Sequence, residues 1–81
     1  MWNCHLGGPP GNAVLLVNRG ARSYVKISGQ RALATYDETN GVRRWVWGQN
    51  AIVLDDEGLA QYFEGGTTET AKAVFRCRRM S

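Results

Sequence analysis

The chain has 81 residues, ten Lys or Arg against seven Asp or Glu, and a formal net charge of +3. This length suits one small domain spanning residues 1–81, and 43% hydrophobic residues make the composition too apolar for a disordered chain. The longest apolar run, residues 13–17, is far shorter than the ~20 residues of a membrane-spanning helix. We therefore predict one globular domain without membrane insertion.

The two cysteines, Cys4 and Cys77, lie near opposite ends of the chain. If they are bonded, they close a loop of roughly 70 residues, for which chain entropy predicts ~4 kcal/mol of stabilisation. Such a bond persists in an oxidising compartment such as the periplasm, whereas free buried thiols would suit the cytoplasm. The residues after Met1 lack the basic and apolar regions of a secretory signal, so no signal peptide is predicted.

Turn signals recur about every eight to ten residues, which is typical of an antiparallel sandwich or barrel. The strongest is Asn40-Gly41, because a type I′ hairpin turn needs positive φ at both central residues. Seven breaks delimit eight short segments, and they fall at residues 7–12, 18–20, 28–30, 40–41, 48–50, 56–58 and 64–66.

The segments between these breaks alternate in the way that half-buried strands do. Both cysteines fall on the apolar face of their segments. In an up-and-down barrel the first and last strands are neighbours, so one topology brings Cys4 beside Cys77. We predict an all-β fold, a small antiparallel meander or up-and-down barrel of about eight strands. The residues that share an apolar face are, in chain order, Trp2 with Cys4 and Leu6, Val25 with Ile27, Trp45 with Trp47, Ile52 with Leu54, Leu59 with Phe63, and Ala71 with Ala73, Phe75 and Cys77.

The alternative is an α+β fold with a C-terminal helix at about residues 68–80. The Ala-rich sequence there, with Arg76, Arg78 and Arg79 in the last turn, is typical of a helix. The apolar spacing on such a helix is poorer than on a strand, so we favour a strand over residues 70–79. A shorter helix is the alternative for residues 56–63, with Asp55 or Asp56 as its cap.

Side chains suited to catalysis or to metal binding are few. His5, the single histidine, follows Cys4 directly, and neighbouring residues of a strand point to opposite faces, so they do not form an activated Cys–His pair. The carboxylates of residues 55–57 coincide with a predicted turn and are read as a solvated hairpin tip. A metal site needs more ligands than one histidine and two distant cysteines. We predict no enzyme, no metal and no cofactor.

Two groups of residues suit binding. Segment 43–47 combines arginines with large aromatics, which are enriched at protein interfaces. As the alternative, Trp45 and Trp47 are core residues of a small barrel. A basic stripe outside the barrel suits an acidic protein or a nucleic-acid backbone. The candidate binding residues are Asn40, Gly41, Arg43, Arg44, Trp45 and Trp47 in the hairpin region, and Lys72, Arg76, Arg78 and Arg79 in the stripe.

Trp2-Asn3-Cys4 near the start and Phe75-Arg76-Cys77 near the end resemble the family of membrane-bound or periplasmic inhibitors of c-type lysozyme. The family's Trp-x-Lys-Gly-x-x-Ala motif, followed by an apolar residue, is similar to segment 45–52, in which Trp47 stands in place of the inhibitory Lys. Segment 40–44 lacks the Ser and Tyr of the family's inhibitory loop. The resemblance implies a small antiparallel barrel whose terminal Cys pair closes the seam, and the inhibitory residues do not carry over.

The predicted function is non-enzymatic binding of a partner protein through the 40–50 hairpin region, in the manner of an inhibitor. One alternative is a small basic barrel that associates with nucleic acid through Arg43, Arg44 and the basic stripe, around Trp45 or Trp47. Another is a small-molecule binder lined by the aromatic face, although eight strands leave little interior volume.

Overall fold

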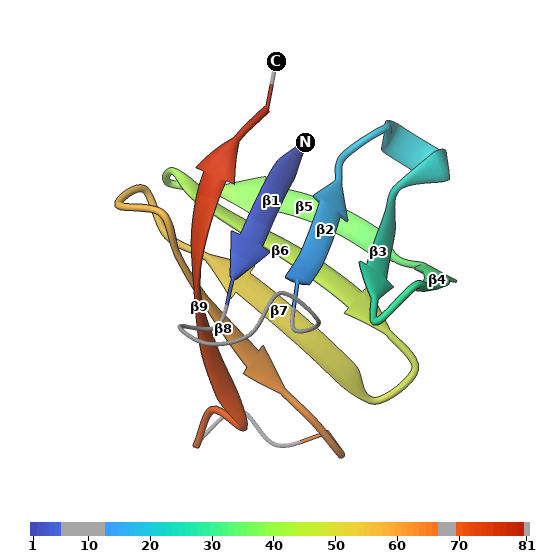
Figure 1. Cartoon of the computed structure of the whole chain (residues 1–81). Helices are drawn as coiled ribbons and strands as arrows, with labels where there is room; N and C mark the ends of the chain where they lie inside the picture. Colours follow the sequence, from blue (N-terminus) through green and yellow to red (C-terminus); the bar gives the residue numbers. More distant parts are fainter. Residues whose placement is uncertain (6–12, 67–69, 81) are drawn as a thin grey trace.

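The computed structural model describes residues 1–5, 13–66 and 70–80, so the predicted turn at 7–12 and the side chain of Leu6 lie outside the described residues. Nine strands form within this part of the chain (Figure 1). A single turn of 3-10 helix, η2 (Gly20–Arg22), stands between the second and third strands. The strands are β1 (Trp2–His5), β2 (Ala13–Val17), β3 (Tyr24–Ile27), β4 (Gln30–Leu33), β5 (Thr35–Thr39), β6 (Val42–Trp47), β7 (Asn50–Leu54), β8 (Leu59–Phe63) and β9 (Ala73–Arg79).

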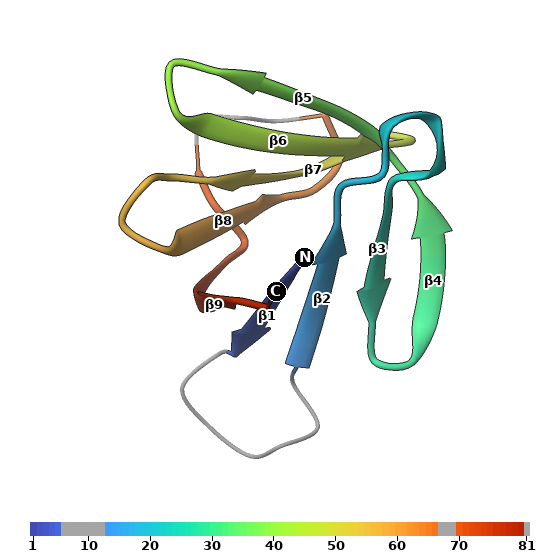
Figure 2. The same ribbon diagram turned by 90° about the horizontal axis from the view of Figure 1, so that it is seen from above.

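The strands form one antiparallel sheet in the order β4-β3-β2-β1-β9-β8-β7-β6-β5. Strands consecutive in the chain are neighbours everywhere except at β4 and β5, and the first strand pairs with the last. The sheet therefore curves into a nearly closed up-and-down barrel with an open seam between β4 and β5 (Figure 2). The predicted all-β antiparallel barrel is confirmed.

The meeting of the two chain ends is also confirmed. β1 and β9 run side by side, and both termini lie at the same end of the barrel (Figure 1). Cys4 stands directly opposite Cys77 in the register of this pair, and the two form a disulfide. Cys4 is fully buried, so the bond joins the strands on their inner side.

Residues 73–79 form a strand with a neighbour on each side, β1 and β8, so the alternative of a C-terminal helix is wrong. The alternative helix over residues 56–63 is wrong too, because residues 59–63 are β8. The Asp55 carboxylate caps the turn before this strand instead. Its Oδ1 accepts hydrogen bonds from the N–H groups of Glu57 and Leu59, both 2.9 Å long. Tertiary pairing thus decides both segments in favour of strand.

The ninth strand arises because the predicted segment between the breaks at 28–30 and 40–41 bends at Ala34. Ala34 donates its N–H to the Ser23 carbonyl at 3.0 Å, which takes it out of the ladder and separates β4 from β5. Ser23 is fully buried, and its Oγ donates to the Gly20 carbonyl (2.8 Å) and accepts from the Arg19 N–H (2.9 Å). A satisfied buried hydroxyl therefore anchors the corner of the barrel.

The hairpin turn between β5 and β6 has the predicted form. Asn40 (φ 53°) and Gly41 (φ 80°) both occupy the left-handed region, as a type I′ turn requires.

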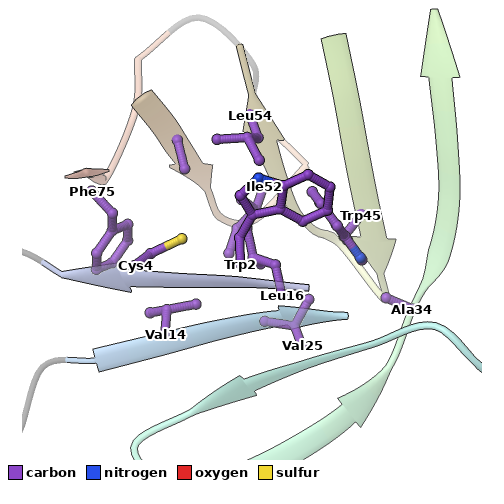
Figure 3. Close-up of a cluster of buried hydrophobic side chains, with 11 residues drawn as sticks. Trp2, Cys4, Val14, Leu16, Val25, Ala34, Trp45, Ile52, Leu54 and Phe75 are labelled. Atoms are coloured by element: carbon purple, nitrogen blue, oxygen red, sulfur yellow. The ribbon is translucent and has the colours of Figure 1, made fainter. Parts of the chain in front are cut away.

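The interior of the barrel is filled by the inward-facing side chains of the strands (Figure 3). Alternation predicts the inner face correctly for β1, β6, β7 and β9. In β8, however, Ala60 and Tyr62 belong to the core cluster, while Leu59 and Phe63 lie on the other face, where Phe63 is nevertheless buried (8% exposed). Ala60 stands opposite Phe75 on one side and Leu54 on the other, and both of these are buried. Because β8 has apolar residues on both of its faces, the neighbouring strands β7 and β9 determine which face of β8 points into the core.

Candidate functional site

The predicted hairpin residues do not form one surface, because β6 alternates between the two faces of the sheet. Arg43, Trp45 and Trp47 share the inner side, and Val42, Arg44 and Val46 share the outer side.

Trp45 belongs to the core. Its side chain is fully buried, and its indole Nε1–H donates to the Val17 carbonyl across the barrel at 3.0 Å. It also packs against the rings of Trp2 (centroids 5.8 Å apart, at 74°) and Tyr36 (4.9 Å). The prediction that Trp45 forms part of an exposed binding surface is therefore wrong, and the core alternative holds.

Trp47 lies on the same inner face of β6 as Trp45, at the last position of the strand. Its side chain is partly exposed. Its ring stacks on Tyr62 of β8, with centroids 6.0 Å apart and an angle of 14° between the planes. The Tyr62 hydroxyl in turn donates a 2.8 Å hydrogen bond to Glu64. Trp47 is thus held in a fixed position at the mouth of the barrel.

The Tyr62 phenol is expected to lose its proton at a higher pH than an ordinary tyrosine, because its pKa is raised. Burial, and then the hydrogen bond and negative charge of Glu64, raise the pKa of Tyr62 to about 12. Since the folded-state value lies above the ordinary value of about 10, the contribution to stability is complete below pH ~10 and is lost as the pH rises towards 12. Phenolate absorbance would measure this, and Glu64→Gln should lower the pKa without returning it to 10, because burial remains. A Tyr62 pKa that Glu64→Gln leaves unchanged would contradict the assignment.

Arg43 packs at the other end of the barrel. Its guanidinium lies 4.7 Å from the centroid of the Trp2 ring, and Arg79 approaches the same ring at 5.9 Å. The Arg43 Nε is buried and lies 3.4 Å from a Glu38 oxygen without forming a hydrogen bond. Arg43 therefore covers Trp2, a structural role, although it was predicted to contact a partner.

Arg44 lies outside, in the middle of an apolar area that we call the β6 surface. Its guanidinium pairs with Asp37 of β5 at 3.0 Å, and both side chains are about half exposed, at 54% and 47%. The cross-strand register places Arg44 beside Val53 and Val46 beside Ala51. The β6 surface consists of the exposed or half-buried side chains of Val42, Arg44, Val46, Ala51 and Val53, and it borders Phe63, which is buried.

Two hollows indent the β6 surface, and Arg44 lines both. One, of about 340 Å³, also touches Asp37, Val42 and Val53. The other, of about 210 Å³, is bounded by Ala51 and Phe63. The hairpin tip at Asn40 and Gly41 adjoins the Val42 end of this surface.

Sequence reasoning missed the apolar part of the β6 surface. The sequence feature that could have revealed it is the run of four apolar residues at 51–54. A strand with such a run is apolar on both faces, so one face packs in the core and the other is apolar on the outside.

The basic stripe is only partly assembled. Arg76 and Arg78 are exposed on the outer side of β9, and Lys72 is exposed just before that strand. Arg79 turns to Trp2 instead. Arg76 stands opposite His5, and Arg78 stands opposite Asn3. A hollow of about 470 Å³ runs between these strands, and within the described part of the chain no stripe residue forms an ion pair.

The nucleic-acid alternative depended on arginines gathered around an exposed tryptophan. Arg76 and Arg78 lie on the outer side of the sheet, whereas Trp45 and Trp47 lie on its inner side. These arginines and tryptophans therefore do not form one surface that could contact phosphates and stack on bases together.

No protein-family model, curated protein or solved structure matches this chain. Among residues 1–5, 13–66 and 70–80, no cluster of three or more His, Cys, Asp or Glu side chains is placed to hold a metal ion. The same residues include no helix with the length and apolar character needed to cross a membrane. The candidate site therefore rests on the geometry of the outer sheet.

Proposed function

We propose that this protein is a non-enzymatic binding module that holds a partner protein on the β6 surface. The observation that carries the proposal is the apolar outer face of β6 and β7, whose inner face already supplies the core residues Trp45, Ile52 and Leu54. Apolar outer surfaces bordered by polar groups are characteristic of protein-interaction sites.

The central position of Arg44 indicates the chemistry of the partner. Exposed ion pairs such as Arg44–Asp37 contribute only ~0–1 kcal/mol, so a carboxylate of the partner can replace Asp37 at little cost. Arginine surrounded by apolar contacts is a common centre of binding energy. We therefore infer a partner that presents an acidic side chain within an apolar patch.

The resemblance to lysozyme inhibitors suggests how such a partner is engaged. A hairpin tip next to an apolar surface, here Asn40–Gly41 beside Val42, suits entry into the cleft of an enzyme. We propose this inhibitor-like mode, and c-type lysozyme is the first purified protein to be titrated.

The test uses a photocrosslinking amino acid in place of Val42, which is 38% exposed. In lysate from cells that produce the protein, we expect a discrete crosslinked protein that binds the purified chain reversibly. Arg44→Glu should weaken this binding at least about tenfold. Arg22→Glu, the same charge change on exposed η2, is the matched control and should leave binding unchanged.

Arg44→Glu should also change the free energy of unfolding by less than about 1 kcal/mol, since it replaces an exposed side chain. Equal loss of binding in the Arg22→Glu variant would contradict the assigned surface. Binding of an oligonucleotide that falls steeply with salt and is weakened by Arg44→Glu, without a crosslinked protein, would favour the nucleic-acid alternative.

A further inference from the structure

The hollow of about 470 Å³ on the outside of the barrel lies over β1 and β9, the strands that join the chain ends (Figure 1). Asn3 and His5 of β1 line it from one side, and Arg76 and Arg78 of β9 line it from the other. All four side chains share the outer face, because the cysteines that alternate with them form the disulfide on the inner side. The register therefore gathers four polar side chains from opposite ends of the chain.

The two arginines of this hollow differ from the other four arginines on strands. Each of those four lies against a carboxylate or over an aromatic ring. They are Arg43 beside Glu38, Arg44 beside Asp37, Arg31 over Tyr24 and Arg79 over Trp2. Within residues 1–5, 13–66 and 70–80, neither Arg76 nor Arg78 has a partner of either kind. Two positive charges are thus left on one face of one strand.

The register keeps these charges together and leaves them without a carboxylate opposite. Arg76 stands between His5 on β1 and Leu59 on β8, and Arg78 stands opposite Asn3 on β1. Residues two apart on a strand are ~6.6 Å apart, so the two long side chains can converge on one group. The Asn3 amide and the His5 ring, ~5 Å away across the ladder, add further N–H donors. Among the described residues that line the hollow, none is acidic.

This arrangement selects an anion with two charges. A guanidinium donates two parallel N–H groups to a phosphate or a carboxylate, and two adjacent guanidiniums match a dianion. A phosphate monoester carries about −1.5 to −2 at pH 7, whereas a carboxylate, a sulfate ester or a phosphodiester carries a single charge. The volume lies within the ~300–1,000 Å³ typical of small-molecule sites, so it has room for an organic group as well as the phosphoryl group.

We propose that this hollow binds a small phosphate monoester, with the phosphoryl group between Arg76 and Arg78 and the organic group over Asn3 and His5. The hollow shares no residue with the β6 surface, so the two proposals are independent.

The probe is phenyl phosphate, titrated into the full chain at about pH 8, where its phosphoryl group is a dianion. His5 is the single histidine, so its ring proton resonances in NMR spectra report on the hollow directly. We expect a saturable shift with a Kd of about 0.1–1 mM. Phenyl sulfate, which has the same shape and one negative charge less, should bind about tenfold more weakly.

Arg76→Gln and Arg78→Gln should each weaken phenyl phosphate binding by about tenfold. Arg22→Gln, the same loss of charge at an exposed position of η2, is the matched control and should bind within about twofold of the wild type. The thermal midpoint and the dispersion of the spectra establish that each variant is folded.

Asn3→Asp tests the site while both arginines remain. The substitution keeps the shape of the side chain and places a carboxylate opposite Arg78. The new carboxylate should pair with Arg78 and repel the phosphoryl group, so phenyl phosphate should bind about tenfold or more weakly.

Three results would overturn the proposal. They are no saturable shift at the His5 ring, equal binding of phenyl sulfate and phenyl phosphate, and equal binding by Arg76→Gln, Arg78→Gln and Arg22→Gln. An oligonucleotide without terminal phosphates that binds more tightly than phenyl phosphate, and is weakened by Asn3→Asp, would assign the hollow to a nucleic-acid backbone and would also overturn it. Arg44→Glu should leave phenyl phosphate binding unchanged, so failure here leaves the partner-protein proposal standing.

Discussion

Reduction of the Cys4–Cys77 disulfide is expected to lower the free energy of unfolding by about 4 kcal/mol. The bond joins residues separated by 73 positions, so it removes a large share of the conformations of the unfolded chain. It also holds the first strand to the last, the pair that joins the two ends of the meander. For a domain of this size the loss corresponds to a fall in Tm of roughly 15–30 °C.

Urea denaturation with and without a reducing agent measures this effect. Cys4→Ala with Cys77→Ala is the matched control, and its midpoint should equal that of the reduced wild type more nearly than that of the oxidised protein. Added reductant should leave the double variant unchanged. Equal midpoints for oxidised and reduced wild type would show that the β1–β9 ladder alone is sufficient to hold the ends together.

The pairing of the first strand with the last was predictable because local signals and topology agree. Two cysteines on apolar faces and a meander of short segments point to the same arrangement, and Asn40-Gly41 fixes one hairpin register through its backbone preference. These signals can be read from residues close together in the chain and from the two-residue alternation of side chains along a strand.

The corner at Ala34 was not predictable from such signals. No Gly, Pro or Asn marks it, because the bend depends on a hydrogen bond to Ser23, eleven residues earlier in the chain. The face of β8 has a similar origin, since Ala60 is directed inward by its partners on β7 and β9. Both features are set by long-range pairing, which a single segment does not encode.

The candidate site lies in the hairpin region that the sequence indicates, but its residues differ from those expected. Arg43 and Arg44 are neighbours in sequence, yet one covers Trp2 and the other lies on the outer surface. The period of two directs them to opposite faces of β6, so the hairpin does not form one continuous surface. The apolar outer residues of β7 were in the sequence as a continuous run, but composition alone does not distinguish a second interface from a deeper core.

Trp45→Ala is expected to be the most destabilising single substitution, at about 3–5 kcal/mol. Trp45 is fully buried and contacts Trp2 and Tyr36, so its removal leaves a large cavity between the two halves of the sheet. The substitution also leaves the Val17 carbonyl without the indole N–H that it accepts at 3.0 Å. Urea denaturation measures the loss, and Trp47→Ala, at a partly exposed indole, should cost clearly less.

Trp45→Phe separates packing from hydrogen bonding, because it keeps a ring and removes the donor to Val17. A loss well below that of Trp45→Ala would assign most of the effect to packing. A chain of 81 residues has about 4–12 kcal/mol of total stability at typical values per residue. Together, Trp45→Ala and reduction of the disulfide are expected to remove about 7–9 kcal/mol. If the oxidised wild type has a measured stability below about 7 kcal/mol, the reduced Trp45→Ala protein should therefore be largely unfolded without denaturant. A cooperative unfolding transition in that protein would then mean that the inner face of β6 contributes far less to the barrel than its burial implies.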